Sequence, residues 1–141
     1  MTQDQKDLLL KDLCARLPYF TKVQIKNEIV VLDSICDDDG YHFNFIGDDR
    51  EGVNIENIKP YLFPLSSMTD ELWDKEFMGY GITEFTRDSF KYGCETLEFN
   101  NDNPHLSSMV RFINQLIKNH FDIYGLIPMG LANDATGLNI Y

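Results

Sequence analysis

Residues 22–46, KVQIKNEIVVLDSICDDDGYHFNFI, decide the fold class, because their apolar residues follow the period of a β-sheet. β-Branched and aromatic residues either alternate with polar residues or are consecutive, as is typical of strands. Two polar turns, Lys26–Glu28 and Asp37–Gly40, separate the candidate strands. Asp-Gly favours a hairpin, since glycine accepts a positive φ. The stretch therefore predicts an antiparallel meander of three or four strands, with the short VNI segment (53–55) as the last candidate.

A helix is expected before the meander. Thr2 and Gln5 form a T-x-x-Q capping box, and Pro18 ends the helix near Arg16. Apolar residues at helical spacing define its core face, which Leu9 widens. They are Leu10, Leu13, Cys14 and Leu17. The same face gives Cys14 a packing role.

A second long helix is expected near the C-terminus. Asn103 is its cap, Pro104 takes its first position, and apolar residues keep helical spacing through about residue 118. Residues 79–103 before it have no clear period, apart from a candidate strand at CETLEF (94–99).

These elements predict a single α+β domain that spans residues 1–141. We expect the small antiparallel meander to pack with the N-terminal helix and with the long helix near the C-terminus. The meander either curls into an SH3-like partial barrel or forms a plain sheet of three or four strands.

The segment KPYLFPLSSMTDELW (59–73) joins the meander to a further helix. Its two prolines favour an extended connector over residues 59–65. Thr69 is a good cap for a helix over about 70–78, and Met68 and Trp73 occupy the two positions of a hydrophobic staple. The alternative interpretation is a recognition surface, because prolines and aromatic residues also mark peptide-binding segments. Its binding residues would be Tyr61, Phe63 and Trp73.

The composition limits the classes of partner. The net charge of −11 repels phosphate backbones and anionic membranes, and the basic residues form no cluster. No apolar run approaches the ~18 residues of a membrane span. The N-terminus lacks the basic start of a signal peptide. We therefore expect a cytoplasmic protein that contacts neither nucleic acid nor membrane directly, and whose acidity either suits a basic partner or only keeps it soluble.

The cysteines and acids predict no metal or cofactor site. Cys14, Cys36 and Cys94 have no C-x-x-C spacing, and we expect them to be reduced and buried. The acidic turn ending at Gly40 does not fit a calcium loop, because isoleucines fall at the first and twelfth ligand positions. Successive turns of a meander lie at opposite ends, so the acids of residues 37–39 and 48–51 are expected to lie apart.

The best catalytic candidates are His120 and Asp122, just after the long helix. A histidine beside a carboxylate is a pairing used for proton transfer or metal ligation. The competing interpretation is architectural, with His120 at the helix C-terminus and Asp122 capping the next turn. The motifs G-x-S-x-G, S-x-x-K and H-E-x-x-H are absent.

Three segments, KDLLLKDLCARLPY (6–19), IKPYLFPLSSMT (58–69) and HFDIYGLIPMGLANDATGLNIY (120–141), carry a resemblance. They resemble a family of short uncharacterised proteins of gut Bacteroides-type bacteria and their phages or mobile elements. The family usually has Gly-Val where this chain has Phe20-Thr21, and Asp-Tyr-Arg-Gly-Leu where it has Asp122–Leu126. The resemblance implies a phage or mobile-element setting and supplies no activity, substrate or catalytic residue.

Three functions follow as hypotheses. The first is a non-enzymatic accessory or binding protein that acts through a protein partner. The second is an acidic mimic of DNA that inhibits a nucleic-acid-binding host protein, which requires carboxylates spaced along one face like phosphates. The third is a small enzyme that uses His120 and Asp122.

Overall fold

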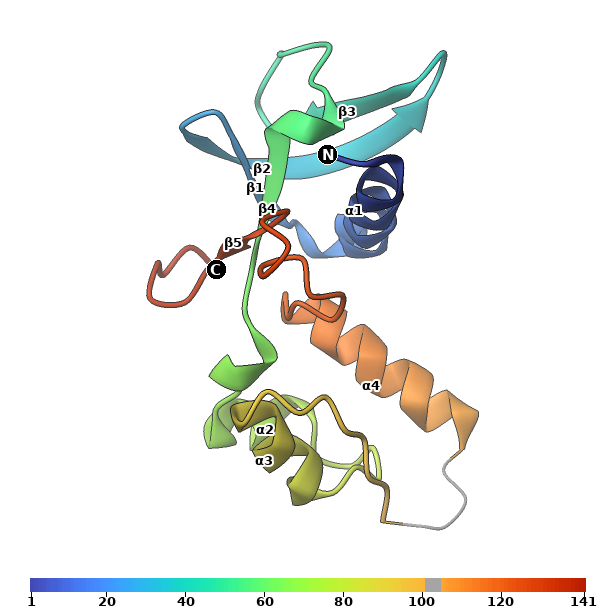
Figure 1. Ribbon diagram of the computed structural model, residues 1–141, viewed down its shortest axis with the longest axis vertical. Helices are drawn as coiled ribbons and strands as arrows, with labels where there is room; N and C mark the ends of the chain where they lie inside the picture. The colour runs from blue at the N-terminus through green and yellow to red at the C-terminus, as the bar shows by residue number, and fades with distance from the viewer. Residues whose placement is uncertain (101–104) are drawn as a thin grey trace. The chain divides into compact units, whose positions relative to one another are not determined.

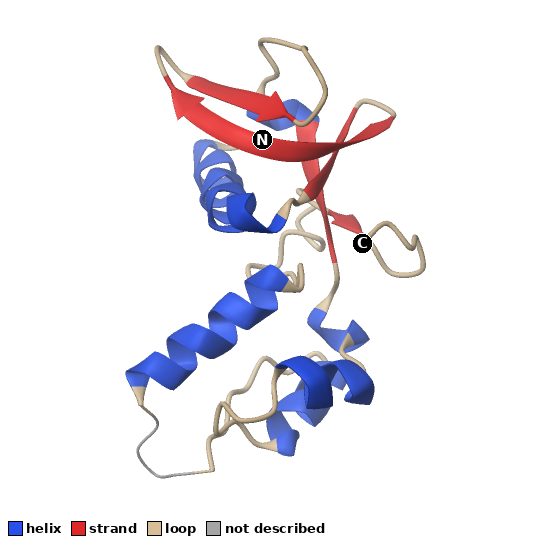
Figure 2. Cartoon of the chain, turned by 180° about the vertical axis from the view of Figure 1, so that it is seen from behind, coloured by secondary structure: helices blue, strands red, loops and turns tan. Residues whose placement is uncertain are grey.

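The computed structural model describes residues 1–100 and 105–141, so the predicted cap at Asn103 and Pro104 lies outside the described residues. The fold is α+β, as predicted, with a mostly antiparallel sheet of five strands in the order β3-β2-β1-β4-β5 (Figures 1 and 2). The chain forms two compact units. The first contains Met1–Leu62 and Tyr124–Tyr141, and the second contains Phe63–Ile123.

The sheet belongs to the first unit. Its strands are β1 (Lys22–Ile25), β2 (Glu28–Asp37), β3 (Tyr41–Phe45), β4 (Ile58–Leu62) and β5 (Asn133–Asp134). β1 pairs antiparallel with β2 and β4, β2 pairs antiparallel with β3, and β5 runs parallel to β4. The meander of the first three strands and its two turns are confirmed. In the second turn Asp39 and Gly40 have φ of 56° and 121°, the conformation for which Asp-Gly is suited.

Strand β2 takes part in two different hairpins. Its first residues, through Val31, pair with β1, and its residues from Leu32 onward pair with β3. A register shift lies between Leu32 and Ser34, where the strand can bend. β3 lies at the end of the strand order, so one of its sides is paired with β2 and the other is an outer edge, on which Phe45 forms an isolated bridge with Asp48.

Helix α1 (Gln3–Arg16) begins at the predicted capping box, which is present in full. Its buried face agrees with the prediction in part, since Leu9 and Leu13 are buried and Leu10 and Leu17 pack on the core. Leu9, Asp12, Leu13 and Arg16 are buried, whereas Cys14 is exposed, as are Cys36 and Cys94. The prediction of buried cysteines is therefore wrong. The face also includes Asp12 and Arg16, which are hydrogen-bonded to each other inside the unit and which the spacing of apolar residues does not predict.

The core of the first unit lies between α1 and the sheet, and the C-terminal segment completes it. Its fully buried side chains include Leu9, Leu13, Val23, Leu32, Ile58, Leu62 and Leu126. The last residue holds the segment in place. Tyr141 Oη accepts a hydrogen bond from the Lys22 amide at 3.1 Å and donates one to the Tyr61 carbonyl at 2.9 Å. The C-terminal tyrosine therefore joins β1 to β4.

Two expectations about residues 53–65 need correction. The VNI segment is not a strand; a short 3₁₀ helix (Ile55–Asn57) leads instead into β4, where a connector was expected. Pro60 lies in β4 opposite Val23, and pairing with β5 begins one residue later, at Tyr61. A proline is tolerated there because it precedes the two-residue ladder on that side.

The second unit is helical, with α2 (Asp70–Glu76), α3 (Glu84–Lys91) and α4 (Leu106–Lys118). Thr69 caps α2 as predicted, since its hydroxyl accepts from the Leu72 amide at 3.2 Å. The core is aromatic: the rings of Trp73 and Phe77 stack at 5.7 Å, and both meet Phe112 of α4 edge-on. The buried side chains of α4 belong to this core, which is separate from that of the sheet.

The spacing of apolar residues did not predict helix α3, because its buried face is partly polar. Its buried residues are Thr86, Ser89 and Phe90. The hydroxyl of Thr86 accepts from the Glu98 amide at 2.8 Å, and that of Ser89 donates to the Thr86 carbonyl at 2.8 Å. Two hydroxyls therefore occupy positions where a periodicity analysis looks for apolar side chains.

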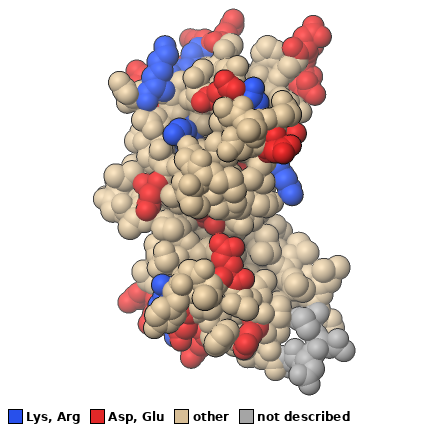
Figure 3. Space-filling view, viewed as in Figure 1, with Lys and Arg blue, Asp and Glu red and all other residues tan. Residues whose placement is uncertain are grey.

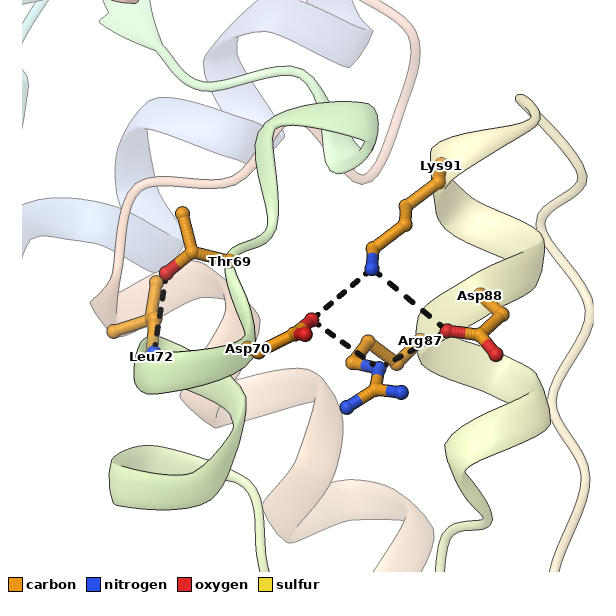
Figure 4. Close-up of polar contacts among 6 residues, drawn as sticks. All are labelled: Thr69, Asp70, Leu72, Arg87, Asp88 and Lys91. Atoms are coloured by element: carbon orange, nitrogen blue, oxygen red, sulfur yellow. Dashed lines mark hydrogen bonds and ion pairs between the residues drawn. The ribbon is translucent and has the colours of Figure 1, made fainter.

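An ion network joins α2 to α3 (Figure 4). Lys91 Nζ lies 3.0 Å from Asp70 Oδ1, and Arg87 Nε lies 3.6 Å from the same oxygen. These cations hold the pKa of Asp70 below its ordinary value, with the Lys91 hydrogen bond as the largest cause. Arg87 also reaches Asp88 at 3.1 Å. The network is exposed, so it orients the two helices more than it stabilises them.

Candidate functional site

His120 and Asp122 are held mainly by main-chain architecture. His120 follows α4 in the left-handed conformation, with φ of 60°. Its amide donates to the Ile117 carbonyl at 3.0 Å, and the Phe121 amide donates to the Leu116 carbonyl at 2.9 Å. These two bonds form a Schellman motif, which closes a helix at a position that usually holds glycine.

The next contacts continue this structural role. The Phe63 amide donates to the His120 carbonyl at 2.9 Å, and the Asp122 amide donates to the Phe63 carbonyl at 2.8 Å. The two catalytic candidates therefore lie side by side with Phe63, and both are buried, with 8% and 5% of their surface exposed. Neither lines the cavities described below.

The structure does not gather the three binding candidates into one exposed surface. Tyr61 belongs to the first unit and is buried in β4, while Phe63 and Trp73 belong to the second. Trp73 is 3% exposed and stacks in the aromatic core. Phe63 is half-buried, and its ring lies 6.3 Å from that of Phe121. The contacts of all three support the interpretation that this segment is a structural connection.

A groove follows the outer edge of β3. It consists of two adjoining depressions of about 300 and 650 Å³, which share His42, Phe43 and Gly52. We call it the β3 groove; its lining residues are Cys36, 38–44 and 51–55. Within the described residues, no hydrogen bond joins residues 41–44 to the segment 51–55 across it. The segment therefore lies beside the edge strand without completing the sheet.

The lining of the β3 groove is acidic on one side. Asp38 and Glu51 line the larger depression and Asp39 the smaller one, and no lysine or arginine lines either. Figure 3 shows acidic side chains gathered at the tip of the β2–β3 hairpin. The expectation that the acids of the two turns lie apart is wrong for Asp38 and Glu51, which line the same depression, because the chain turns tightly between Phe45 and Asp48 and then returns along β3.

The same depression contains a thiol, an imidazole and an amide. Cys36 lies directly opposite His42 in the strand register. Asn44 Nδ2 donates to Cys36 Sγ at 3.8 Å, and His42 Nε2 lies 2.7 Å from the Asp38 carbonyl oxygen. Since a carbonyl only accepts, that nitrogen carries the proton. All three residues are exposed, so the imidazole and the amide can make polar contacts in the groove and the Cys36 thiol can be alkylated.

A second cavity, of about 680 Å³, lies beside the β1–β2 turn, and three of its charged lining residues are paired with one another, whereas Lys26 and Glu51 line it as well. Arg50 Nε lies 2.7 and 2.8 Å from the two carboxylate oxygens of Asp48, and Arg50 Nη2 lies 2.5 Å from Glu28 Oε2. These bonds raise the pKa of Arg50, and the Arg50 side chain lowers that of Asp48. The trio fixes the loop that forms the wall of the β3 groove.

Sequence reasoning missed the β3 groove because its parts lie far apart in the chain. The alternation of Tyr41, His42 and Phe43 predicted the strand, and the acidic turn predicted its hairpin. No sequence pattern predicted that Glu51 and Gly52 would lie beside the outer edge of β3. Within the described part of the chain, no group of three metal-ligating side chains occurs, and no helix is long and apolar enough to cross a membrane.

Comparisons of the chain with protein-family models, with curated proteins and with solved structures found no match. The resemblance to short proteins of Bacteroides-type bacteria and their mobile elements stays a prediction.

Proposed function

We propose that the chain is a non-enzymatic, cytoplasmic binding module in a phage or mobile-element setting, and that it acts through a protein partner held at the β3 groove. One observation carries the proposal: β3 is an edge strand whose outer side faces a groove. Proteins normally cover or block an exposed edge, because its main-chain groups can pair with another chain. Addition of a strand to such an edge is a common mode of peptide recognition.

The cysteines offer a direct test. Cys36 lines the groove, whereas Cys94 is exposed in the second unit. Two variants would each keep one of them, C14S/C94S and C14S/C36S. Each would be alkylated with pyrenyl maleimide and used to capture proteins from a Bacteroides-type lysate. The proposal predicts that the adduct on Cys36 abolishes capture of a partner that the unmodified variant retains, while the adduct on Cys94 does not. Equal capture by both adducts would refute a role for the groove.

A further inference from the structure

We infer that the partner segment is an extended strand in which lysine or arginine alternates with apolar residues. The inference rests on the proposed function, and it adds the chemistry of the bound segment. A strand paired with β3 sends successive side chains to opposite faces of the sheet. The two faces of the β3 groove differ in chemistry, so the two sets of side chains meet different surroundings.

One face of the groove is acidic. Cys36, His42 and Asn44 share a face of the hairpin, and the depression over them is bounded by Asp38 and Glu51. Among residues 1–100 and 105–141 neither carboxylate has an ion-pair partner, and both residues are exposed. The nearest arginine, Arg50, is already bound by Asp48 and Glu28. Cationic side chains of a bound strand would therefore find two carboxylates that form no ion pair with the described residues.

The other face of the groove is largely apolar, although Asp39 also lines the smaller depression. Tyr41 lies on the opposite side of β3 from His42 and is 51% exposed. Across the smaller depression from it lie Val53 and Ile55, which are half-buried and pack on the first core. Apolar side chains at alternate positions of a bound strand would cover this surface. β3 has five residues, which span about 17 Å, and Phe45 is already bridged to Asp48, so about four residues of the segment would pair.

The test uses three fluorescein-labelled octapeptides. The first alternates Lys and Val, the second (KKVVKKVV) has the same composition without the alternation, and the third alternates Glu and Val. Binding would be measured by fluorescence anisotropy, and alkylation of Cys36 by mass spectrometry, with Cys94 of the same chain as the internal reference. D38N/E51Q removes the two carboxylates of the larger depression and leaves Asp39 in the smaller one. D74N/E95Q removes the same charge from exposed sites of the second unit and is the matched control.

The alternating Lys-Val peptide should bind the unmodified chain and the control equally and slow the alkylation of Cys36. D38N/E51Q should bind it roughly fivefold more weakly at low salt, which is the loss expected for two exposed ion pairs. Equal weakening by both variants, or equal binding of KKVVKKVV, would overturn the inference. Protection of Cys36 by the Glu-Val peptide would contradict the inference that the bound segment is basic. It would still agree with the proposal that a segment binds in the β3 groove. If no peptide protects Cys36, the inference about the segment is wrong. The proposed function is then tested independently by comparing partner capture with the Cys36 adduct and with the Cys94 adduct.

Discussion

Arg16 and Asp12 form a doubly hydrogen-bonded ion pair inside the first unit. Arg16 Nε donates to Asp12 Oδ2 at 2.7 Å and Nη2 donates to Oδ1 at 2.8 Å, and neither side chain has exposed surface. The spacing of four residues places both groups on one face of α1. Two charges inside a core are tolerated only while each satisfies the other.

Removing one member of this pair should be costly. Asp12→Ala is expected to lower the free energy of unfolding by about 3–5 kcal/mol, because it removes a carboxylate that accepts two hydrogen bonds from the buried guanidinium. Asp12→Leu combined with Arg16→Met should recover most of that loss. Urea unfolding followed by circular dichroism measures both, with Asp7→Ala on the exposed side of α1 as the control. A cost below about 1 kcal/mol for Asp12→Ala would show that the pair is not needed.

The left-handed conformation of His120 predicts an unusual order of stability. If the residue mainly closes α4, His120→Gly should be more stable than His120→Ala by about 1 kcal/mol, since alanine is strained at positive φ. Thermal unfolding of the two variants gives the difference. Equal stability would mean that the main-chain conformation is not what matters at this position. A measurable activity lost in His120→Ala at an unchanged melting temperature would favour the enzyme hypothesis.

Tyr141 predicts a loss of stability at alkaline pH. Burial raises its pKa to about 12, from an ordinary value of 10.0. The folded state therefore favours the protonated phenol, and this contribution is complete below pH 10 and disappears as the pH rises toward 12. Tyr141→Phe should remove that part of the pH dependence, along with the hydrogen bonds to Lys22 and Tyr61. Unfolding at pH 8 and pH 11 tests this; an identical pH dependence in both proteins would contradict it.

Asp70 predicts the opposite behaviour in acid. Its pKa lies below the ordinary value of 3.8, first because of the Lys91 hydrogen bond and then because of Arg87. A depressed pKa stabilises the fold above pH 3.8, and the contribution is lost as the pH falls through the folded value. Carbon-detected NMR titration of the Asp70 carboxylate should show that Lys91→Ala raises its pKa more than Arg87→Ala does. The reverse order would assign the main cause to Arg87.

The predictable parts of the fold are those encoded by neighbouring residues. The capping box at Thr2, the hairpin turn at Asp39-Gly40 and the cap at Thr69 each depend on side chains within a few positions, and all three are present. Strand alternation identified β3 for the same reason. Such signals act through local backbone conformation, so a single sequence is enough to detect them.

The features that were missed depend on polar groups satisfied by distant or buried partners. The face of α1 was predicted incompletely because Asp12 and Arg16 are buried there as a pair. Helix α3 was missed because hydroxyls of Thr86 and Ser89 bond to the main chain on its buried side. The β3 groove requires the chain near Gly52 to return to an edge strand. None of these arrangements has an apolar period to reveal it.

The most direct test of the central claim is amide hydrogen exchange across β3 with and without a bound segment. The alternating Lys-Val octapeptide serves as the probe, and the peptic fragments compared are those that cover residues 41–45 and helix α4. If a segment pairs with the outer edge of β3, exchange of the β3 fragment should slow several-fold at saturating probe, while that of α4 stays the same. Binding that leaves exchange in β3 unchanged would contradict strand addition at this edge.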